Sequence, residues 1–481
     1  MTTPNFPEPV PVARHRVPLW TGSIDTARGG IGIREKLSYA LGDIGSNVIF
    51  VPATSLILFY LTDVVGMGAA IAGTLILIGQ LLNGITDLTI GVLIDRTSTV
   101  WGKTRPWVIL SSVPLAVSFV LLFSVPSGLS ETGQVVWTLI FYSLVIAVFF
   151  TSANVAYSAL LSVMTPDPKT RVTLTTFRFF AALLAGLVVG AGTLPLVEAL
   201  GNGQEGWTRA SIIYGVICVA ALSTVFFGTR ERVRQAPPAK SETVARQPLR
   251  QQFGNLARNK YFFLAAGLFL VFYLNQGLTG SAGVYYATEI LGDSSVYSLL
   301  SIAQLVPPLI GLAFMPAVIG RIGKRKAFLI GTVAMFVGAA FPLLDPSSIT
   351  VVVIGVVIRG IALVPFSAGL FAIVADVVDY GEWRFGERTD GLIFSGAVIG
   401  QKIGGGLGSA LVGWILAMGG YVANAATQTA SGTGAIQALF IYIPIGLAVI
   451  AGVLVYFFKL ERHQDEISAF LAGRADETRT A

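Results

Sequence analysis

The chain has 481 residues, of which 54% are hydrophobic and only 12% are charged, with a formal net charge of +6. A soluble protein of this size carries about 25% charged residues, so the composition excludes an ordinary soluble enzyme or binding domain. Apolar runs of about twenty residues recur along the whole length, and each can cross a hydrocarbon core about 30 Å thick. The sequence therefore predicts an all-α membrane protein.

Twelve membrane helices are predicted in chain order. They cover residues 38–62, 67–94, 107–125, 134–162, 172–199, 209–228, 260–291, 295–319, 327–345, 349–378, 390–417 and 436–458. The first 35 residues contain Pro and Arg without an apolar core, so we expect no cleavable signal peptide. The predicted organisation is a tail at 1–36, a six-helix bundle at 37–228, a polar linker at 229–259, a second six-helix bundle at 260–458 and a tail at 459–481.

The positions of lysine and arginine predict the orientation in the membrane. In this twelve-helix topology, 28 of the 32 basic residues fall in the tails, the linker and the loops on one side of the membrane. The loops on the opposite side hold only Arg209. Basic loops are retained in the cytoplasm during insertion, so both termini and the linker are predicted to be cytoplasmic. This placement accounts for the positive charge without a nucleic-acid partner.

A weak internal repeat accompanies the division into six and six. The loop after the second helix runs from Asp95 to Arg105, and the loop after the eighth runs from Gly320 to Lys326. Both are short, basic and Gly-containing, which two parallel repeats related by an axis along the membrane normal predict. Short basic turns are also common in cytoplasmic hairpins generally, so that simpler explanation stays open.

The scarcity of cysteine and histidine argues against catalysis. Cys218 is the only cysteine, and His15 and His463 both lie in the polar tails. No intramolecular disulfide or thiolate metal site is therefore possible, and the interior lacks the usual general base. We find no nucleophile–base pair in the helices and predict that the chain is not an enzyme.

Five charged residues lie well inside predicted membrane helices, embedded among apolar or small residues, where an ionisable group costs about 2.5–3.5 kcal/mol on insertion scales. They are Asp43, Asp87, Arg178, Arg359 and Lys402. For Arg359 we weigh a purely structural role, in which an ion pair positions helices. Asp87 is different, because Gln80 and Asn83 precede it at helical spacing and share its face. A carboxylate among amides can bind a cation or a proton, although pairing with Lys402 or Arg178 is the structural alternative.

Two asparagines form a second constellation. Asn47 and Asn154 lie in otherwise apolar or small-residue stretches of the first and fourth helices. Amides both donate and accept hydrogen bonds, and Arg178 could donate two to vicinal hydroxyls, as a sugar would require. Buried amides also join helices, so the pattern alone leaves both roles open. The glycine run from 400 to 408 sits in mid-helix and predicts close helix packing.

Several motifs in combination resemble the glycoside–pentoside–hexuronide:cation symporter family of the major facilitator superfamily, which includes the melibiose carrier. They are Lys36-Leu-Ser-Tyr-Ala-Leu-Gly-Asp43, Phe59-Tyr-Leu-Thr-Asp-Val-Val-Gly66, Asp95-Arg-Thr with Trp101-Gly-Lys-Thr-Arg-Pro-Trp107, Arg178-Phe-Phe-Ala, and Ala375-Asp-Val-Val-Asp-Tyr-Gly-Glu382. The resemblance spans residues 36 to about 459. It implies the major facilitator fold and an alternating-access carrier that couples solute movement to Na⁺, Li⁺ or H⁺.

The resemblance also implies a cation site. The matching positions are Asn83, Asp87, Thr86 and Thr151. The melibiose carrier has a second acid where this chain has Asn83. One remaining carboxylate suits a proton better than a dehydrated Na⁺, so we favour H⁺ as the coupling ion and keep Na⁺ at Asp87 as the alternative.

The family's sugar site matches Asn47, Asn154 and Arg178, with Lys402 linking the sugar and cation regions; we include Asp43 in this substrate-binding set. The melibiose carrier has aspartates at the two asparagine positions and a tryptophan where this chain has Ser158. These departures put α-galactosides in doubt but not transport.

The sequence therefore predicts a cation-coupled sugar or glycoside symporter of the bacterial inner membrane. Its expected partners are the solute, the coupling ion and the lipid bilayer; we expect a monomer, with no cofactor and no bound metal. The alternatives are a major facilitator carrier of a lysolipid or drug, a membrane receptor, and a membrane enzyme.

Overall fold

The computed structural model describes residues 31–165, 167–232, 254, 256–386, 389–425 and 427–470. Within these ranges the regular structure is helical, apart from one isolated bridge between Thr99 and Gly102. Helices satisfy their own backbone hydrogen bonds, which a chain that crosses lipid must do. Most of the predicted tails and linker lies outside the described residues.

The first half of the chain forms six helical spans, two of which contain π-helical turns. Their segments are α1 (Ile33–Val51), η1 (Pro52–Leu56), α2 (Ile57–Phe59), η2 (Tyr60–Val64), α3 (Ala69–Arg96), α4 (Arg105–Leu122), α5 (Glu131–Ser143), η3 (Leu144–Phe150), α6 (Thr151–Met164), α7 (Pro168–Ala199) and α8 (Gly203–Gly228). The α1–η2 segments are one continuous span, as are α5–α6.

The second half repeats this plan. Its segments are α10 (Lys260–Tyr285), η4 (Tyr286–Ile290), α11 (Val296–Ile322), α12 (Lys324–Ala340), η5 (Phe341–Leu343), α13 (Ile349–Phe385), α14 (Asp390–Met418), α15 (Ala430–Gln437), η6 (Ala438–Tyr442), α16 (Ile443–Phe457) and η7 (Leu460–His463).

All twelve predicted spans are present among the described residues. Eleven are long and apolar enough to cross a membrane. The twelfth, α14, has 29 residues but is less apolar because it carries Gln401, Lys402 and many glycines. The chain is therefore a multi-pass membrane protein with the predicted number of helices.

Several helix ends differ from the prediction. The first helix begins at Ile33, inside the predicted tail, and α13 continues to Phe385 rather than ending at 378. Helices need not end where apolar sequence ends, because they can extend into water until a stop residue. For α13 that residue is Gly386, whose left-handed backbone (φ 73°) terminates the helix.

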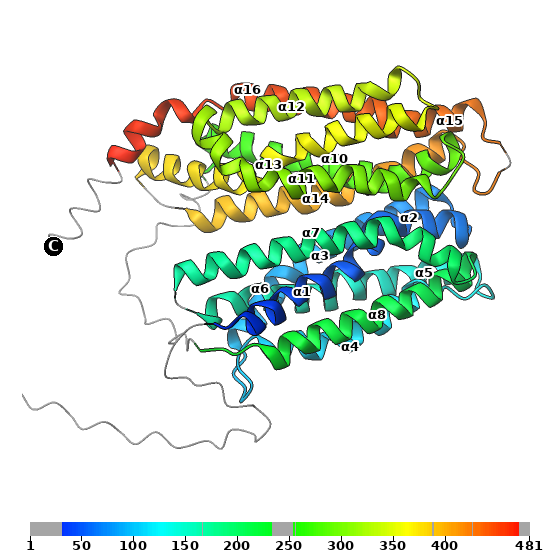
Figure 1. The fold of residues 1–481 in the computed structure, drawn as a ribbon, viewed down its shortest axis with the longest axis horizontal. Coiled ribbons are helices and arrows are strands. Elements are labelled where there is room, and N and C mark those ends of the chain that lie inside the picture. The colour runs from blue at the N-terminus through cyan, green and yellow to red at the C-terminus, as the bar shows by residue number, and fades with distance from the viewer. Residues whose placement is uncertain are drawn as a thin grey trace, which may run out of the picture.

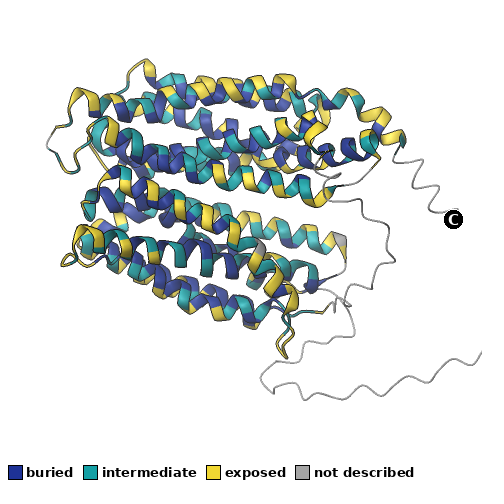
Figure 2. Cartoon of the chain, turned by 180° about the vertical axis from the view of Figure 1, so that it is seen from behind, coloured by how far each residue is buried: buried dark blue, intermediate teal, exposed yellow. Residues whose placement is uncertain are grey.

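The two halves form two adjacent bundles, with α1–α8 in one and α10–α16 in the other (Figure 1). Helix α3 packs against α14, α7 against α11, and η1 against α10, so these pairs join the bundles. Exposed residues follow the outward faces of the helices (Figure 2), and they include large apolar side chains such as Val188, Val216 and Val333. Apolar side chains on an outward face are those that lipid would cover.

We call the end of the bundles that carries the basic turns before α4 and α12 the basic end, and the opposite end the acidic end. At the basic end of the first half, the Glu231 carboxylate accepts hydrogen bonds from the backbone N–H groups of Lys103, Thr104 and Arg105 (2.8–3.0 Å). The Arg105 side chain donates in turn to the carbonyl of Phe226 and lies over its ring.

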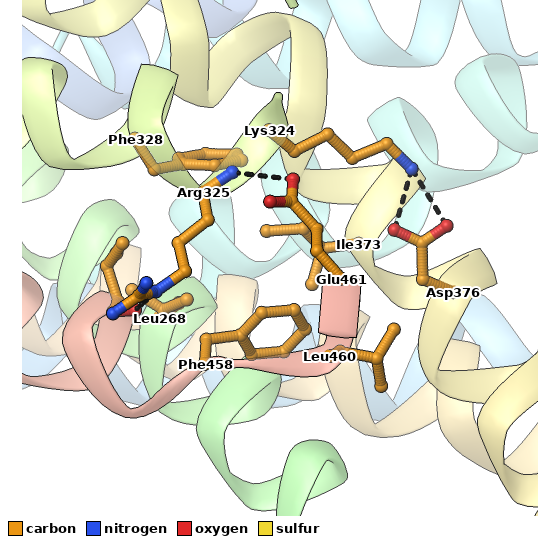
Figure 3. A pocket seen from close by; sticks show the side chains of 10 residues that line it. Leu268, Lys324, Arg325, Phe328, Ile373, Asp376, Phe458, Leu460 and Glu461 are labelled. Carbon is orange, nitrogen blue, oxygen red and sulfur yellow. Dashed lines mark hydrogen bonds and ion pairs between the residues drawn. The ribbon is translucent and has the colours of Figure 1, made fainter. Parts of the chain in front are cut away.

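The second half has the same arrangement. Glu461 accepts from the backbone N–H of Arg325 (2.9 Å), and the Arg325 side chain donates to Tyr456 and lies over its ring. Lys324 beside it forms an ion pair with Asp376 (Figure 3). The two basic turns therefore tie the start of α4 and of α12 to the chain after the sixth and twelfth spans, as the predicted repeat requires.

A second repeat was not predicted from the sequence. The π-helical turns η2 and η4 read Tyr-Leu-Thr-Asp-Val and Tyr-Ala-Thr-Glu-Ile, and both are followed two residues later by a glycine with positive φ, Gly66 and Gly292. The first and seventh spans thus end alike at the acidic end.

The glycine run of α14 serves close packing, as predicted. A Cβ atom built on Gly404 or Gly408 would overlap backbone atoms of α10, including the carbonyl oxygens of Leu270 and Leu274, whereas one on Gly405 would meet nothing within 4 Å. The two helices approach this closely only because glycine removes the side chain from one of them.

Gly408→Ala should therefore destabilise the protein by about 1–3 kcal/mol through overpacking, while Gly405→Ala should be tolerated. Thermal unfolding of the two purified variants in detergent tests this contrast. Equal melting temperatures for both variants would contradict the packing role.

Candidate functional site

Two polar clusters lie among the apolar helices. The first joins α1, α6 and α7 within the first bundle, and the second joins α3 and α6 to α14 across the two bundles. The residues of the predicted cation and substrate sites lie on these helices, but not all of them join the hydrogen-bonded clusters.

The first cluster is built on a bidentate ion pair between Asp43 of α1 and Arg178 of α7. The Arg178 Nε donates to Asp43 Oδ2 (2.7 Å) and Nη2 donates to Oδ1 (3.3 Å). The side chains keep only 10% and 19% of their surface exposed. Bidentate pairs of this kind are strong and directional, so Arg178 is held in one orientation.

Two tyrosines and one serine complete this cluster. Tyr157 donates to Asp43 Oδ2 (2.9 Å) or to the carbonyl of Tyr39 (2.7 Å), and its ring lies 4.3 Å from the Arg178 guanidinium carbon. The guanidinium also approaches Tyr39 Oη and Ser158 Oγ, both at 3.4 Å. Cation–π contact with Tyr157 adds to the ion pair in holding the arginine.

Sequence reasoning missed the two tyrosines, and it noted Ser158 only as a departure from the family. Helical spacing contained a signal for both tyrosines: Tyr39 precedes Asp43 by four residues, and Tyr157 follows Asn154 by three. Residues at these spacings share a helix face.

The two predicted asparagines behave differently. Asn47 Nδ2 donates to the carbonyl of Asp43 one turn earlier in α1 (2.7 Å), which leaves its side-chain oxygen as an acceptor. Asn154 is half-buried in α6 and makes no hydrogen bond with another described residue. Both amides therefore keep hydrogen-bonding capacity for a polar ligand.

The second cluster is centred on the ammonium group of Lys402 in α14. It forms an ion pair with Asp87 and donates to Asn83 Oδ1 (2.8 Å) and to the Asn83 carbonyl (3.2 Å). An ammonium has three N–H donors, and three oxygens of α3 accept them. We weighed Lys402 and Arg178 as ion-pair partners of Asp87. In the structure Lys402 is the partner and Arg178 is not.

The two predicted threonines differ in their relation to this cluster. Thr151 Oγ1 lies 2.9 Å from Asn83 Oδ1, and both side chains are buried. The hydroxyl of Thr86 instead donates to the carbonyls of Leu82 and Asn83 in its own helix. Thr151 therefore belongs to the hydrogen-bonded cluster, whereas Thr86 only borders it.

Arg359 has the structural role that we weighed, in which it positions helices, but it does so without an acidic partner. It is buried and donates to the carbonyls of Gly338 in α12 and Phe440 in η6 (3.2 and 2.6 Å). The guanidinium also lies over the Phe440 ring, 4.6 Å from its centre. A π-helical turn alters the regular carbonyl pattern of a helix, and Arg359 takes up one such carbonyl there.

A family model described as MFS/sugar transport protein matches residues 38–462. The chain is 32% identical to the isoprimeverose transporter of Lactiplantibacillus pentosus over 443 residues, which is 91% of each chain. It is 31% identical to the inner membrane symporter YicJ of Escherichia coli, over 90% of this chain and 93% of the relative.

Solved structures of the same fold show lower sequence identity. A crystal structure of a D-xylose–proton symporter aligns with a TM-score of 0.59 and 16% identity, over 89% of this chain and 96% of the other. At this identity the likeness establishes the fold alone, which is the predicted major facilitator arrangement.

Removing one partner of the Asp43–Arg178 pair should be costly. Asp43→Asn leaves the guanidinium buried without a carboxylate, so we expect a loss of about 3–5 kcal/mol. The double variant Asp43→Asn/Arg178→Gln should recover much of that loss, because neither charge remains. Thermal unfolding measures both.

The exposed pair of Arg209 and Glu205 provides the matched control. Arg209→Gln should change stability by no more than about 1 kcal/mol. A double variant as unstable as Asp43→Asn would show that the two charges are not coupled.

Proposed function

Because the chain belongs to the glycoside–pentoside–hexuronide:cation symporter family of the major facilitator superfamily, we propose that it moves a sugar or glycoside together with a proton across a bacterial inner membrane. It does so by alternating access, with the basic end in the cytoplasm and the acidic end outside. The observation that carries this proposal is the link from Lys402 to Asp87 and Asn83, which connects the two bundles.

The link makes the relation between the bundles depend on the charge of Asp87. When Asp87 is ionised, it neutralises Lys402 across the interface between α3 and α14. When Asp87 takes up a proton, Lys402 loses its counter-charge and keeps only neutral acceptors, among them the two Asn83 oxygens. Protonation therefore weakens one contact between the bundles, and a ligand that binds the two arrangements unequally shifts their equilibrium.

The same contacts favour a proton over Na⁺. A sodium ion would need several oxygen ligands, and the best-placed ones, from Asp87 and Asn83, already surround the Lys402 ammonium. Na⁺ would have to displace that ammonium with only one carboxylate to compensate both charges, whereas a proton needs only the Asp87 oxygen. We therefore propose H⁺ as the coupling ion, with Asp87 as its carrier and Asn83, Thr86 and Thr151 around it.

The first cluster supplies the proposed solute site. Asn47 and Asn154 retain free hydrogen-bonding capacity, and the fixed guanidinium of Arg178 lies beside the Ser158 hydroxyl. Asp43 orients Arg178 and is a further acceptor for solute hydroxyls. Donors and acceptors of this kind suit the hydroxyl-rich surface of a sugar. Lys402 is the residue that couples this site to Asp87 in the proposal.

Asp87→Asn tests the coupling role directly. The variant cannot take up and release a proton, so it should lose accumulation against a gradient while keeping solute exchange down a gradient. Accumulation and counterflow of radiolabelled solute, measured in proteoliposomes with an imposed pH gradient, distinguish the two.

The control is Glu131→Gln, which removes an exposed acid at the acidic end and should accumulate solute like the parent protein. Full accumulation by Asp87→Asn would reject the proposed proton site.

Solute and ion can be identified by uptake into proteoliposomes. We expect saturable uptake of a glycoside or pentose, tested with isoprimeverose, D-xylose and a glucuronide, and accompanied by proton entry that does not require Na⁺. Uptake that follows a Na⁺ gradient at constant pH would overturn the proton assignment. Transport of a lysophospholipid but no sugar would support the alternative carrier.

A further inference from the structure

The two bundles meet at the acidic end through a cluster of uncharged donors and two acids. The acids are Asp63 of η2 and Glu289 of η4, and each is the fourth residue of its repeated π-helical turn. They therefore occupy equivalent positions in the two halves of the chain. Neither belongs to the proposed proton or solute site.

Both acids approach one hydroxyl. The Oη of Tyr421, in the loop after α14, lies 2.7 Å from Asp63 Oδ1 and 3.2 Å from Glu289 Oε1. Asn424 of the same loop donates to the backbone carbonyl of Asp63 (2.8 Å). A phenol carries a single proton, so Tyr421 can satisfy only one of the two carboxylates at a time.

The surroundings offer further hydroxyls but no positive charge. Thr62 Oγ1 lies 2.6 Å from Asp63 Oδ2 and 2.7 Å from the hydroxyl of Tyr285 in α10. Among the neighbouring elements that the structure describes, α2, α15 and the first two turns of α3 contain no titratable residue, and α11 brings only the phenol of Tyr297.

Arg209 near the start of α8, the single basic residue described at the acidic end, is engaged elsewhere. Arg209 pairs with Glu205 and donates to the carbonyl of Leu200. Two ionised carboxylates at one hydroxyl would therefore repel each other without compensation, since like charges sharing a site disfavour double ionisation.

We propose that Asp63, Glu289 and Tyr421 form a proton-dependent latch, which holds the acidic ends of the two bundles together when one of the two acids is protonated and releases them when both are ionised. The acid that holds the proton donates a hydrogen bond to the other carboxylate or accepts one from the Tyr421 hydroxyl. With one added proton, both acids and the tyrosine therefore have a hydrogen-bond partner. This proton is distinct from the one proposed at Asp87, and the latch regulates opening rather than coupling.

The sign of the pH dependence follows from the proton count. The joined arrangement holds one proton more than the separated one, so it is favoured at low pH and lost as pH rises. Linkage then makes the ratio of separated to joined molecules rise about tenfold per pH unit over the range in which the proton is released.

One asymmetry in the repeat supplies an independent variant. Tyr285 and Phe59 are equivalent residues with their rings in edge contact, and Thr62 and Thr288 are equivalent too. Thr62 meets the Tyr285 hydroxyl, whereas the buried Thr288 hydroxyl has no partner among the described residues. Phe59, which is equivalent to Tyr285, has no hydroxyl to offer it. Phe59→Tyr should supply that partner and strengthen the joined arrangement without changing its charge.

Distances between spin labels at the acidic end test the latch. Labels at Thr132→Cys and Ser294→Cys lie in exposed positions on opposite bundles, and Cys218→Ala removes the native thiol. The full chain is measured without solute by pulsed electron paramagnetic resonance between pH 5.5 and 8.5. An Asp87→Asn background removes titration at the proposed coupling site, so failure of the latch and failure of the coupling proposal remain distinguishable.

As pH rises, the parent should shift from short to long distances between the labels. In the middle of the range, its ratio of separated to joined molecules should rise about tenfold per pH unit. Asp63→Asn and Asp63→Asn/Glu289→Gln should stay joined at every pH. Phe59→Tyr should lower the ratio of separated to joined molecules about fivefold through one added hydrogen bond, with an unchanged pH slope.

Asp293→Asn is the matched control at the same end. Hydrogen bonds from Ser295 hold the pKa of Asp293 below its usual value, so this exposed acid stays ionised throughout the range, and its removal should leave the pH profile unchanged. A parent without pH dependence, a double variant that retains the parent's slope, or distances that follow Na⁺ at constant pH would each overturn the proposal.

Discussion

The contact on which the structure most depends is the one between the Lys402 ammonium and the oxygens of α3. A charged lysine within a membrane helix is expensive unless every donor is matched, and Asp87 and Asn83 together match all three. Lys402 and its partners belong to different bundles. The need of the Lys402 ammonium for a counter-charge and acceptors therefore constrains the relative position of the two bundles. A proton at Asp87 changes that requirement, which is why this pair, rather than the better-buried Asp43–Arg178 pair within one bundle, is suited to coupling.

The same principle separates the roles of the other buried charges. Arg178 is neutralised within its own bundle by Asp43, so its charge does not depend on the relative position of the halves. Arg359 is satisfied by carbonyl groups and needs no acid. Asp63 and Glu289 have no positive partner among the described residues and meet across the bundles. Groups that are compensated inside one bundle act as fixed binding or packing elements, whereas those compensated between bundles can respond to movement.

The repeat explains why Asp63 and Glu289 occupy equivalent positions in the two halves. The paired contacts of Glu231 with Arg105 and of Glu461 with Arg325 brace the basic end of each bundle separately. The paired turns η2 and η4 instead bring their acids to a common point at the acidic end. When two repeats are related by a pseudo-twofold axis, equivalent residues that lie away from the axis are far apart. Equivalent residues that lie near the axis face each other. Of these two sets of paired contacts, only the one at the acidic end joins the bundles.

Much of the architecture could be predicted from the sequence. The number of helices, their membrane location and the charged residues within them follow from hydrophobicity and from the cost of charge in lipid, which are properties of residues taken along the chain. Thr86 and Thr151 were candidates only because the resemblance to the family implied them. The partners could not be derived in this way. That Lys402 meets Asp87, that Tyr157 braces Arg178, and that one tyrosine serves both Asp63 and Glu289 depend on which helix faces meet. The π-helical turns also alter those faces in ways that regular periodicity does not anticipate. The residue types by themselves determined that buried charges must be compensated, while the packing of helices distant in sequence decided which group compensates which, because ion pairs and hydrogen bonds form over a few ångströms in space regardless of separation along the chain.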